Sequence, residues 1–138
     1  MALVLDTGPI VAALDAGDAD HDACVQLFKL PGQRRVVVAP VLVELDHLLT
    51  RRVGTHAFPA LLETVQRGEL DVLALSAQDY VRAGELMRTY ADLRVGFVDA
   101  AVLAVVERLR EPKLATLDHR HFSVMRPRHV EALELLPA

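Results

Sequence analysis

Short apolar runs alternate along the chain with longer segments in which apolar residues recur at helical spacing. The short runs are rich in Val and Leu and predict buried strands at residues 3–5, 36–38, 72–75, 114–117 and, as a fifth, 131–136. The periodic segments predict helices from Pro9, over 23–30, from Pro40, over 57–67, after a cap at Ser76, and over 97–110. This alternation predicts an α/β fold, a three-layer α/β/α sandwich around a four- to five-stranded parallel sheet.

The chain has 138 residues, the size of one domain, and no linker-like segment divides residues 1–138. Its single cysteine, Cys24, excludes a disulfide framework and a cysteine-rich zinc site, and we expect it to be a small buried residue. No apolar run reaches the roughly 18 residues of a membrane span. Asp6 interrupts the first apolar run before it resembles a signal peptide. We therefore expect a cytoplasmic protein that makes no contact with a membrane.

Four acidic residues are predicted to meet at one edge of the sheet. Asp6 directly follows the first strand and Asp118 directly follows the fourth, so both lie where parallel strands end. Glu44 is one turn into the helix that follows the second strand, and Asp99 is in the first turn of the helix over 97–110. Taken singly, each acid has an ordinary explanation as a helix cap, a turn residue or a solvated side chain. One edge of one sheet explains all four together.

Such a cluster requires a cation or bound protons. Apolar residues flank Glu44 and Asp99, and neither apolar run contains a Lys or Arg to pair with them. Four carboxylates about 5 Å apart repel by roughly 20 kcal/mol at an effective dielectric of about 20. Hard oxygen ligands without thiols favour Mg²⁺, or Mn²⁺ in its place, over Zn²⁺. Thr7 and Thr116 each neighbour one of the acids, and their hydroxyls are candidates to bind a water of the metal or a ligand carboxylate.

The net charge of −4 disfavours nucleic-acid binding at first sight. If the four clustered acids bind metal, fifteen of the nineteen acids remain, which equals the fifteen Lys plus Arg. The rest of the molecule is then neutral, and the metal attracts phosphate. The acidic total therefore does not argue against an RNA substrate.

At these residues the sequence resembles the PIN-domain family, and in particular the VapC-type toxin ribonucleases of bacterial toxin–antitoxin pairs. The matching motifs are VLDTGPI at 4–10, VLVEL at 41–45, LRVGFVDAA at 93–101 and LATLDHRHF at 114–122. The resemblance runs from residue 3 to about 136, with the acids in the order and spacing of the family.

The resemblance implies a metal-dependent endoribonuclease that cuts structured RNA such as tRNA or ribosomal RNA and leaves 5′-phosphate and 3′-hydroxyl ends. Asp6 and Asp99 are then direct or water-mediated Mg²⁺ ligands, while Glu44 and Asp118 complete the acidic ring and one of them orients the attacking water. A second metal joining with the substrate is compatible with this chemistry. The resemblance also implies a five-stranded parallel sheet, a homodimer, and a VapB-like antitoxin that blocks the site, often with a basic side chain.

The main alternative is a PIN-like module that binds RNA or a protein without cutting. An aspartic protease, suggested by the Asp6-Thr7-Gly8 triplet, is disfavoured because a helix pattern follows it. The acidic segment over 15–22 lacks the Gly and Glu of a calcium loop. We expect His119 and His121 to be surface residues of a turn, with RNA contact as the alternative, and Phe122 to be a core residue.

Overall fold

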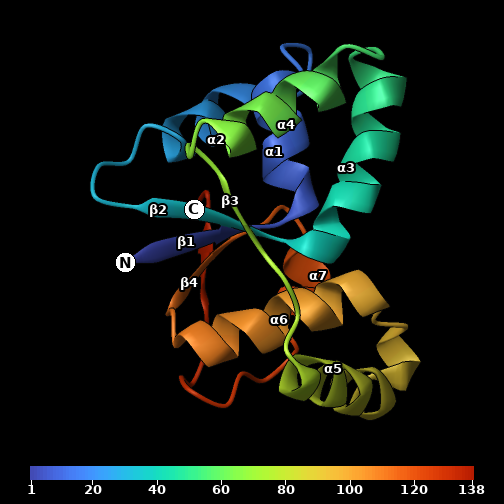
Figure 1. Cartoon of the computed structure of the whole chain (residues 1–138). Helices are drawn as coiled ribbons and strands as arrows, with labels where there is room; N and C mark the ends of the chain where they lie inside the picture. Colours follow the sequence, from blue (N-terminus) through green and yellow to red (C-terminus); the bar gives the residue numbers. More distant parts are fainter.

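A computed structural model describes all residues from 1 to 138 and contains one sheet of five parallel strands. The strands are β1 (Ala2–Leu5), β2 (Arg34–Val38), β3 (Asp71–Leu73), β4 (Lys113–Ala115) and β5 (Glu134–Leu136). The helices are α1 (Thr7–Leu14), α2 (His21–Leu27), α3 (Ala39–Arg52), α4 (Ala57–Gln66), α5 (Ala77–Thr89), the 3₁₀ turn η1 (Ala91–Leu93), α6 (Phe97–Leu109) and α7 (His119–Phe122). Helices α1 to α4 cover one face of the sheet and α5 and α6 cover the other (Figure 1). The predicted three-layer α/β/α sandwich is confirmed.

The strand order is β3-β2-β1-β4-β5, so the chain reverses direction across the sheet between β1 and β4. Two main-chain hydrogen bonds continue the sheet beyond the strand ends, one between β1 and β4 and one between β4 and β5. The amide of Asp6 donates to the carbonyl of Ala115 at 2.8 Å, and the amide of Thr116 donates to the carbonyl of Leu136 at 2.9 Å. In open parallel sheets, ligands bind beyond the carboxyl ends of the strands at such a reversal.

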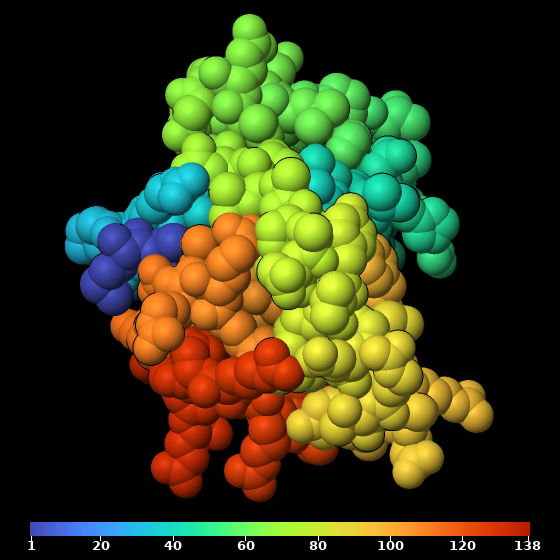
Figure 2. Space-filling model, turned by 60° about the horizontal axis from the view of Figure 1, so that its bottom comes forward, coloured from blue at the N-terminus to red at the C-terminus, as the bar shows by residue number.

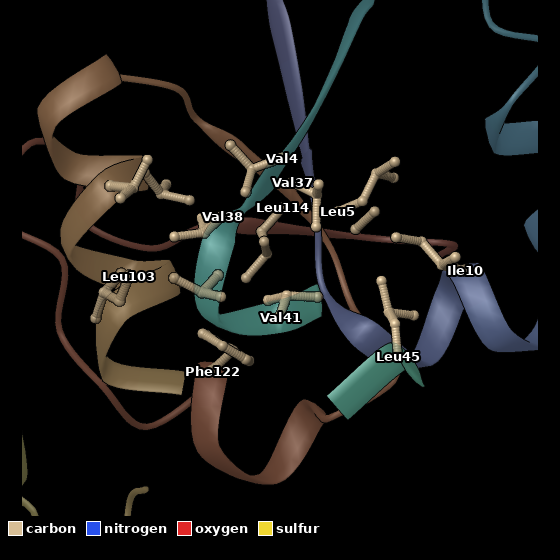
Figure 3. Packing of buried hydrophobic residues seen from close by; sticks show 14 of the residues in the cluster. Val4, Leu5, Ile10, Val37, Val38, Val41, Leu45, Leu103, Leu114 and Phe122 are labelled. Carbon is tan, nitrogen blue, oxygen red and sulfur yellow. The ribbon is translucent and has the colours of Figure 1, made fainter. Parts of the chain in front are cut away.

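The central strands are apolar throughout because both of their faces are covered. Every residue of β1 is buried, and Figure 3 shows Val4 and Leu5 packed among side chains of β2, β4, α1 and α3. Helix α6 is also buried on most sides, with residues 100–106 at most 3% exposed, since it lies between the sheet and α5. Phe122 and Cys24 are buried, as predicted. The core therefore fixes the starts of α1, α3 and α6 relative to the sheet.

Three details differ from the sequence expectations. Strand β4 ends at Ala115 rather than at residue 117, because Asp118 caps a short helix, α7, where a turn was expected. Its Oδ1 accepts a hydrogen bond from the amide of His121 at 3.1 Å. Leu117 instead packs against Gly8, where an added Cβ would lie 3.3 Å from the Cβ of Leu117. The fifth strand starts at Glu134 rather than at residue 131.

The face shown in Figure 2 brings the C-terminal segment (red) beside α5 (yellow-green). There Arg128 pairs with Glu85 at 2.7 Å. None of the helices combines the length and apolarity needed to cross a bilayer.

Candidate metal centre

The four acids come from four elements that start at the carboxyl edge of the sheet. Asp6 precedes α1, Asp118 precedes α7, Asp99 is in the first turn of α6, and Glu44 is in α3. Burial raises the pKa of Asp99 from 3.8 to about 6, and the charges of Asp6, Asp118 and Glu44 contribute to the rise. The structure therefore brings the four carboxyl groups within electrostatic reach of one another.

Asp6 is the most deeply placed of the four, with 5% of its surface exposed. Burial raises its pKa, against the opposing effect of hydrogen bonds from the Thr7 amide and the Thr116 hydroxyl. The Thr116 hydroxyl donates to Asp6 Oδ2 at 2.8 Å and accepts from the amide of Asp118 at 3.0 Å. The Asp6 side chain does not cap α1. A helix cap therefore does not explain this residue, and Thr116 joins the two acids that follow β1 and β4.

Glu44 is solvent-exposed, which corrects the argument that its apolar neighbours surround it. Val43 beside it is 75% exposed, whereas Val41 and Leu45 face the core. The charge of Glu44 nevertheless acts on the buried acids, and the Thr7 hydroxyl donates to its Oε1 at 2.6 Å. Glu44 thus forms the outer rim of the cluster, held in place by the first residue of α1.

His121 is a member of the cluster that the sequence reasoning missed. Its Nδ1 lies 2.8 Å from Asp118 Oδ2 and 3.1 Å from Asp99 Oδ2, and its Nε2 lies 3.0 Å from the carbonyl oxygen of Leu93. Burial favours the neutral ring, but the bonds to Asp118 and Leu93 and the two carboxylate charges outweigh it and raise the His121 pKa. The signal available in the sequence was the Asp-x-x-His spacing, which puts His121 at the third position of a helix capped by Asp118.

No Lys or Arg forms an ion pair with any of the four acids. Buried or half-buried carboxylates are costly unless a positive charge balances them, and His121 is the one basic side chain in contact with these acids. Ligand atoms of Asp99, Asp118 and His121 all lie within 4.8 Å of one another. Carboxylate oxygens with at most one imidazole suit Mg²⁺ or Mn²⁺. The donor set therefore fits a divalent cation.

The chain is similar in sequence to known proteins. A sequence profile of the PIN domain matches residues 3–126. The chain is 34% identical to ribonuclease VapC26 of Mycobacterium tuberculosis over 125 residues, which are 91% of this chain and 93% of VapC26.

Two solved structures share the fold. VapC20 of Mycobacterium tuberculosis, described as a sarcin–ricin loop cleaving toxin, matches with a TM-score of 0.78 and 25% identity over 86% of this chain and 92% of its own. VapBC2 from Rickettsia felis, bound to a DNA fragment from its promoter, matches with a TM-score of 0.67 and 20% identity over 98% of each chain. The second likeness concerns the fold alone.

Proposed function

The chain belongs to the PIN-domain family, among its VapC-type toxins, and from this premise we propose that it is a Mg²⁺- or Mn²⁺-dependent endoribonuclease of a type II toxin–antitoxin system. The observation that carries the proposal is the convergence of Asp6, Glu44, Asp99 and Asp118, without a Lys or Arg partner, where the strand order reverses. A non-catalytic binding module has no need for four acids that share a single histidine as their basic partner.

Asp6 and Asp99 are proposed to hold the cation, with Asp118 and Glu44 completing the oxygen donors. When bound, the cation supplies positive charge that stabilises the phosphate and favours ionisation of the attacking water. Thr116 keeps Asp6 directed into the site through its 2.8 Å hydrogen bond. Because Glu44 is exposed and only its Oε1 is engaged, its second oxygen is available to orient the water.

The reaction is hydrolysis of a phosphodiester. The water oxygen attacks phosphorus, the bond to the 3′ oxygen breaks, and that oxygen takes up a proton. The products are a 5′-phosphate and a 3′-hydroxyl end. Ends of the opposite kind, a 2′,3′-cyclic phosphate and a 5′-hydroxyl, would indicate attack by the ribose and contradict the assignment.

We propose structured RNA, of the tRNA or ribosomal class, as the substrate. The likeness to VapC20, a sarcin–ricin loop cleaving toxin, makes a hairpin of that ribosomal sequence the first substrate to test. A VapB-like antitoxin is proposed as the partner that blocks the site. A homodimer is also proposed, and sedimentation of the purified chain tests it.

The deciding experiment incubates the protein with the hairpin and with total RNA under three conditions. Wild type with Mg²⁺ is expected to produce new 5′-phosphate ends, whereas wild type with chelator and Asp99→Asn with Mg²⁺ are not. Cutting of total RNA but not of the hairpin would keep the ribonuclease and reject the substrate. RNA binding under all three conditions without new ends would favour the non-catalytic module.

A further inference from the structure

The ring of His121 is oriented by a backbone acceptor. Its Nε2 lies 3.0 Å from the Leu93 carbonyl oxygen, which can only accept, so we assign the ring hydrogen to Nε2. Its Nδ1 consequently faces the Asp118 and Asp99 carboxylates, 2.8 and 3.1 Å away. In the absence of a metal, Nδ1 can carry a proton and donate it to these carboxylates, whereas a divalent cation would displace that proton and take up the Nδ1 lone pair. The three atoms therefore surround a position that suits either a shared proton or a divalent cation.

The spacing of the three atoms suits a metal. In an octahedral site with bonds of about 2.1 Å, neighbouring ligand atoms are roughly 3 Å apart. Both N–O distances match that separation, and the three donors lie within 4.8 Å of one another. Acid–histidine pairs three residues apart on one helical face also hold iron and manganese in helical bundles. A backbone carbonyl that accepts from the second ring nitrogen is the usual support of a histidine ligand.

We propose that His121 is a direct nitrogen ligand of the divalent cation and that it makes the centre select Mn²⁺ over Mg²⁺. The inference rests on the proposed function, because it assigns a ligand to the same cation. Mg²⁺ is usually held by carboxylates and water, whereas manganese also takes a histidine in the carboxylate–histidine sites of helical bundles. Loss of the ring should therefore weaken Mn²⁺ binding more than Mg²⁺ binding.

The test uses the full chain loaded with Mn²⁺ and a pulsed electron paramagnetic resonance measurement of nitrogen coupling. Wild type is expected to show the ¹⁴N coupling of a directly bound imidazole, and His121→Gln to lack it. His119→Gln is the matched control, because His119 is exposed on the same short helix and has no side-chain contact with the acids. In titrations, His121→Gln is expected to weaken Mn²⁺ binding at least about tenfold, with a smaller loss for Mg²⁺.

The outcomes separate this inference from the proposed function. Wild type that binds Mn²⁺ without ¹⁴N coupling, or His121→Gln that keeps the coupling, would overturn the ligand assignment and leave the nuclease proposal intact. Equal losses of Mn²⁺ and Mg²⁺ affinity would overturn the selectivity. Wild type that binds neither ion would overturn both proposals. If His121→Gln does not fold, His121→Asn gives the same comparison, and the wild-type spectrum still decides whether nitrogen is bound.

Discussion

Helices α5 and α6 place buried acids at two distant points, and their surroundings differ. Toward the C-terminal end of α6, Arg108 reaches both oxygens of Asp79, at 3.0 and 3.2 Å, and Arg82 reaches both oxygens of Glu107, at 2.8 and 3.1 Å. In the first turn of the same helix, Asp99 has no Lys or Arg partner. Asp79 is 3% exposed and also caps α5 through the amide of Ser76.

Asp79 and Glu107 are paired with arginines and stabilise the fold. Asp99 lacks such a partner and is available to bind a cation. Asp79 and Glu107 have their charge balanced within the chain, so their removal should cost stability. Asp99 is balanced only in part, through His121, so its removal should cost function. The predictions below test that division, from the largest expected effect to the smallest.

Asp99→Asn should reduce RNA cleavage by about a thousandfold or more, equivalent to roughly 4 kcal/mol, because an amide cannot replace the carboxylate at the cation. The melting temperature of the metal-free chain should stay the same or rise, since a repelled charge is removed. Cleavage kinetics and a thermal melt check the two parts. A variant that loses its fold would show that Asp99 is structural and contradict the division.

Arg108→Met should lower the free energy of unfolding by roughly 3 kcal/mol, because it leaves the buried Asp79 without its partner. Cleavage below the melting temperature should be unchanged. Arg67→Met is the control, since Arg67 pairs with Glu69 at the surface and its loss should not move the melt measurably. Loss of cleavage in folded Arg108→Met would show that the Asp79–Arg108 pair affects the candidate metal centre, and would contradict the division.

Lowering the pH should stabilise the metal-free wild type relative to Asp99→Asn. The pKa of Asp99 is about 6 in the folded chain and 3.8 ordinarily, so the folded chain binds more protons between these values. Stability due to this group therefore rises as the pH falls through about 6 and levels off below about 4, by roughly 2 kcal/mol after screening by solvent. Chemical denaturation of both chains across this range measures the difference.

The same protonation should remove activity. A proton on Asp99 competes with the cation, so at a cation concentration below saturation cleavage should fall as the pH drops below about 6. A cation affinity that stays constant from pH 7 to pH 5 would contradict the assignment of Asp99 as a ligand.

Thr116→Val should lower cleavage by about tenfold and stability by about 1 kcal/mol, because the hydroxyl that joins Asp6 to the Asp118 amide is lost. Thr64→Val is the control, since its hydroxyl donates to the carbonyl of Leu61 within α4. Equal cleavage by Thr116→Val and wild type would show that Thr116 does not position Asp6.

The sheet and the long helices were predictable from the sequence because they depend on periodicity. Helix α6 is apolar over most of its length, and β1 and β2 are short runs bounded by polar or turn residues. The position of Asp6 followed from the same rule, since an acid after a parallel strand lies at its carboxyl edge. Asp99 lies near Asp6 because of the way α6 packs on the sheet. The sequence indicated this packing only through the family resemblance.

Other features depend on contacts between distant residues. Four residues are too few for helical periodicity, so α7 was expected to be a turn and His121 a surface residue. The exposure of Glu44 depends on which face of α3 meets the core. The pairing of Asp79 with Arg108 joins residues 29 positions apart, and no local sequence pattern predicts it.

The strand order also decides when during synthesis the molecule becomes able to act. Strand β4 docks beside β1, yet it lies in the last fifth of the chain, and Asp118 and His121 come after it. A nascent chain that ends before residue 113 already carries Asp6, Glu44 and Asp99 but has no neighbour for β1 on that side. Translation therefore delays assembly of the four acids into one cluster until residues 113–121 have been made.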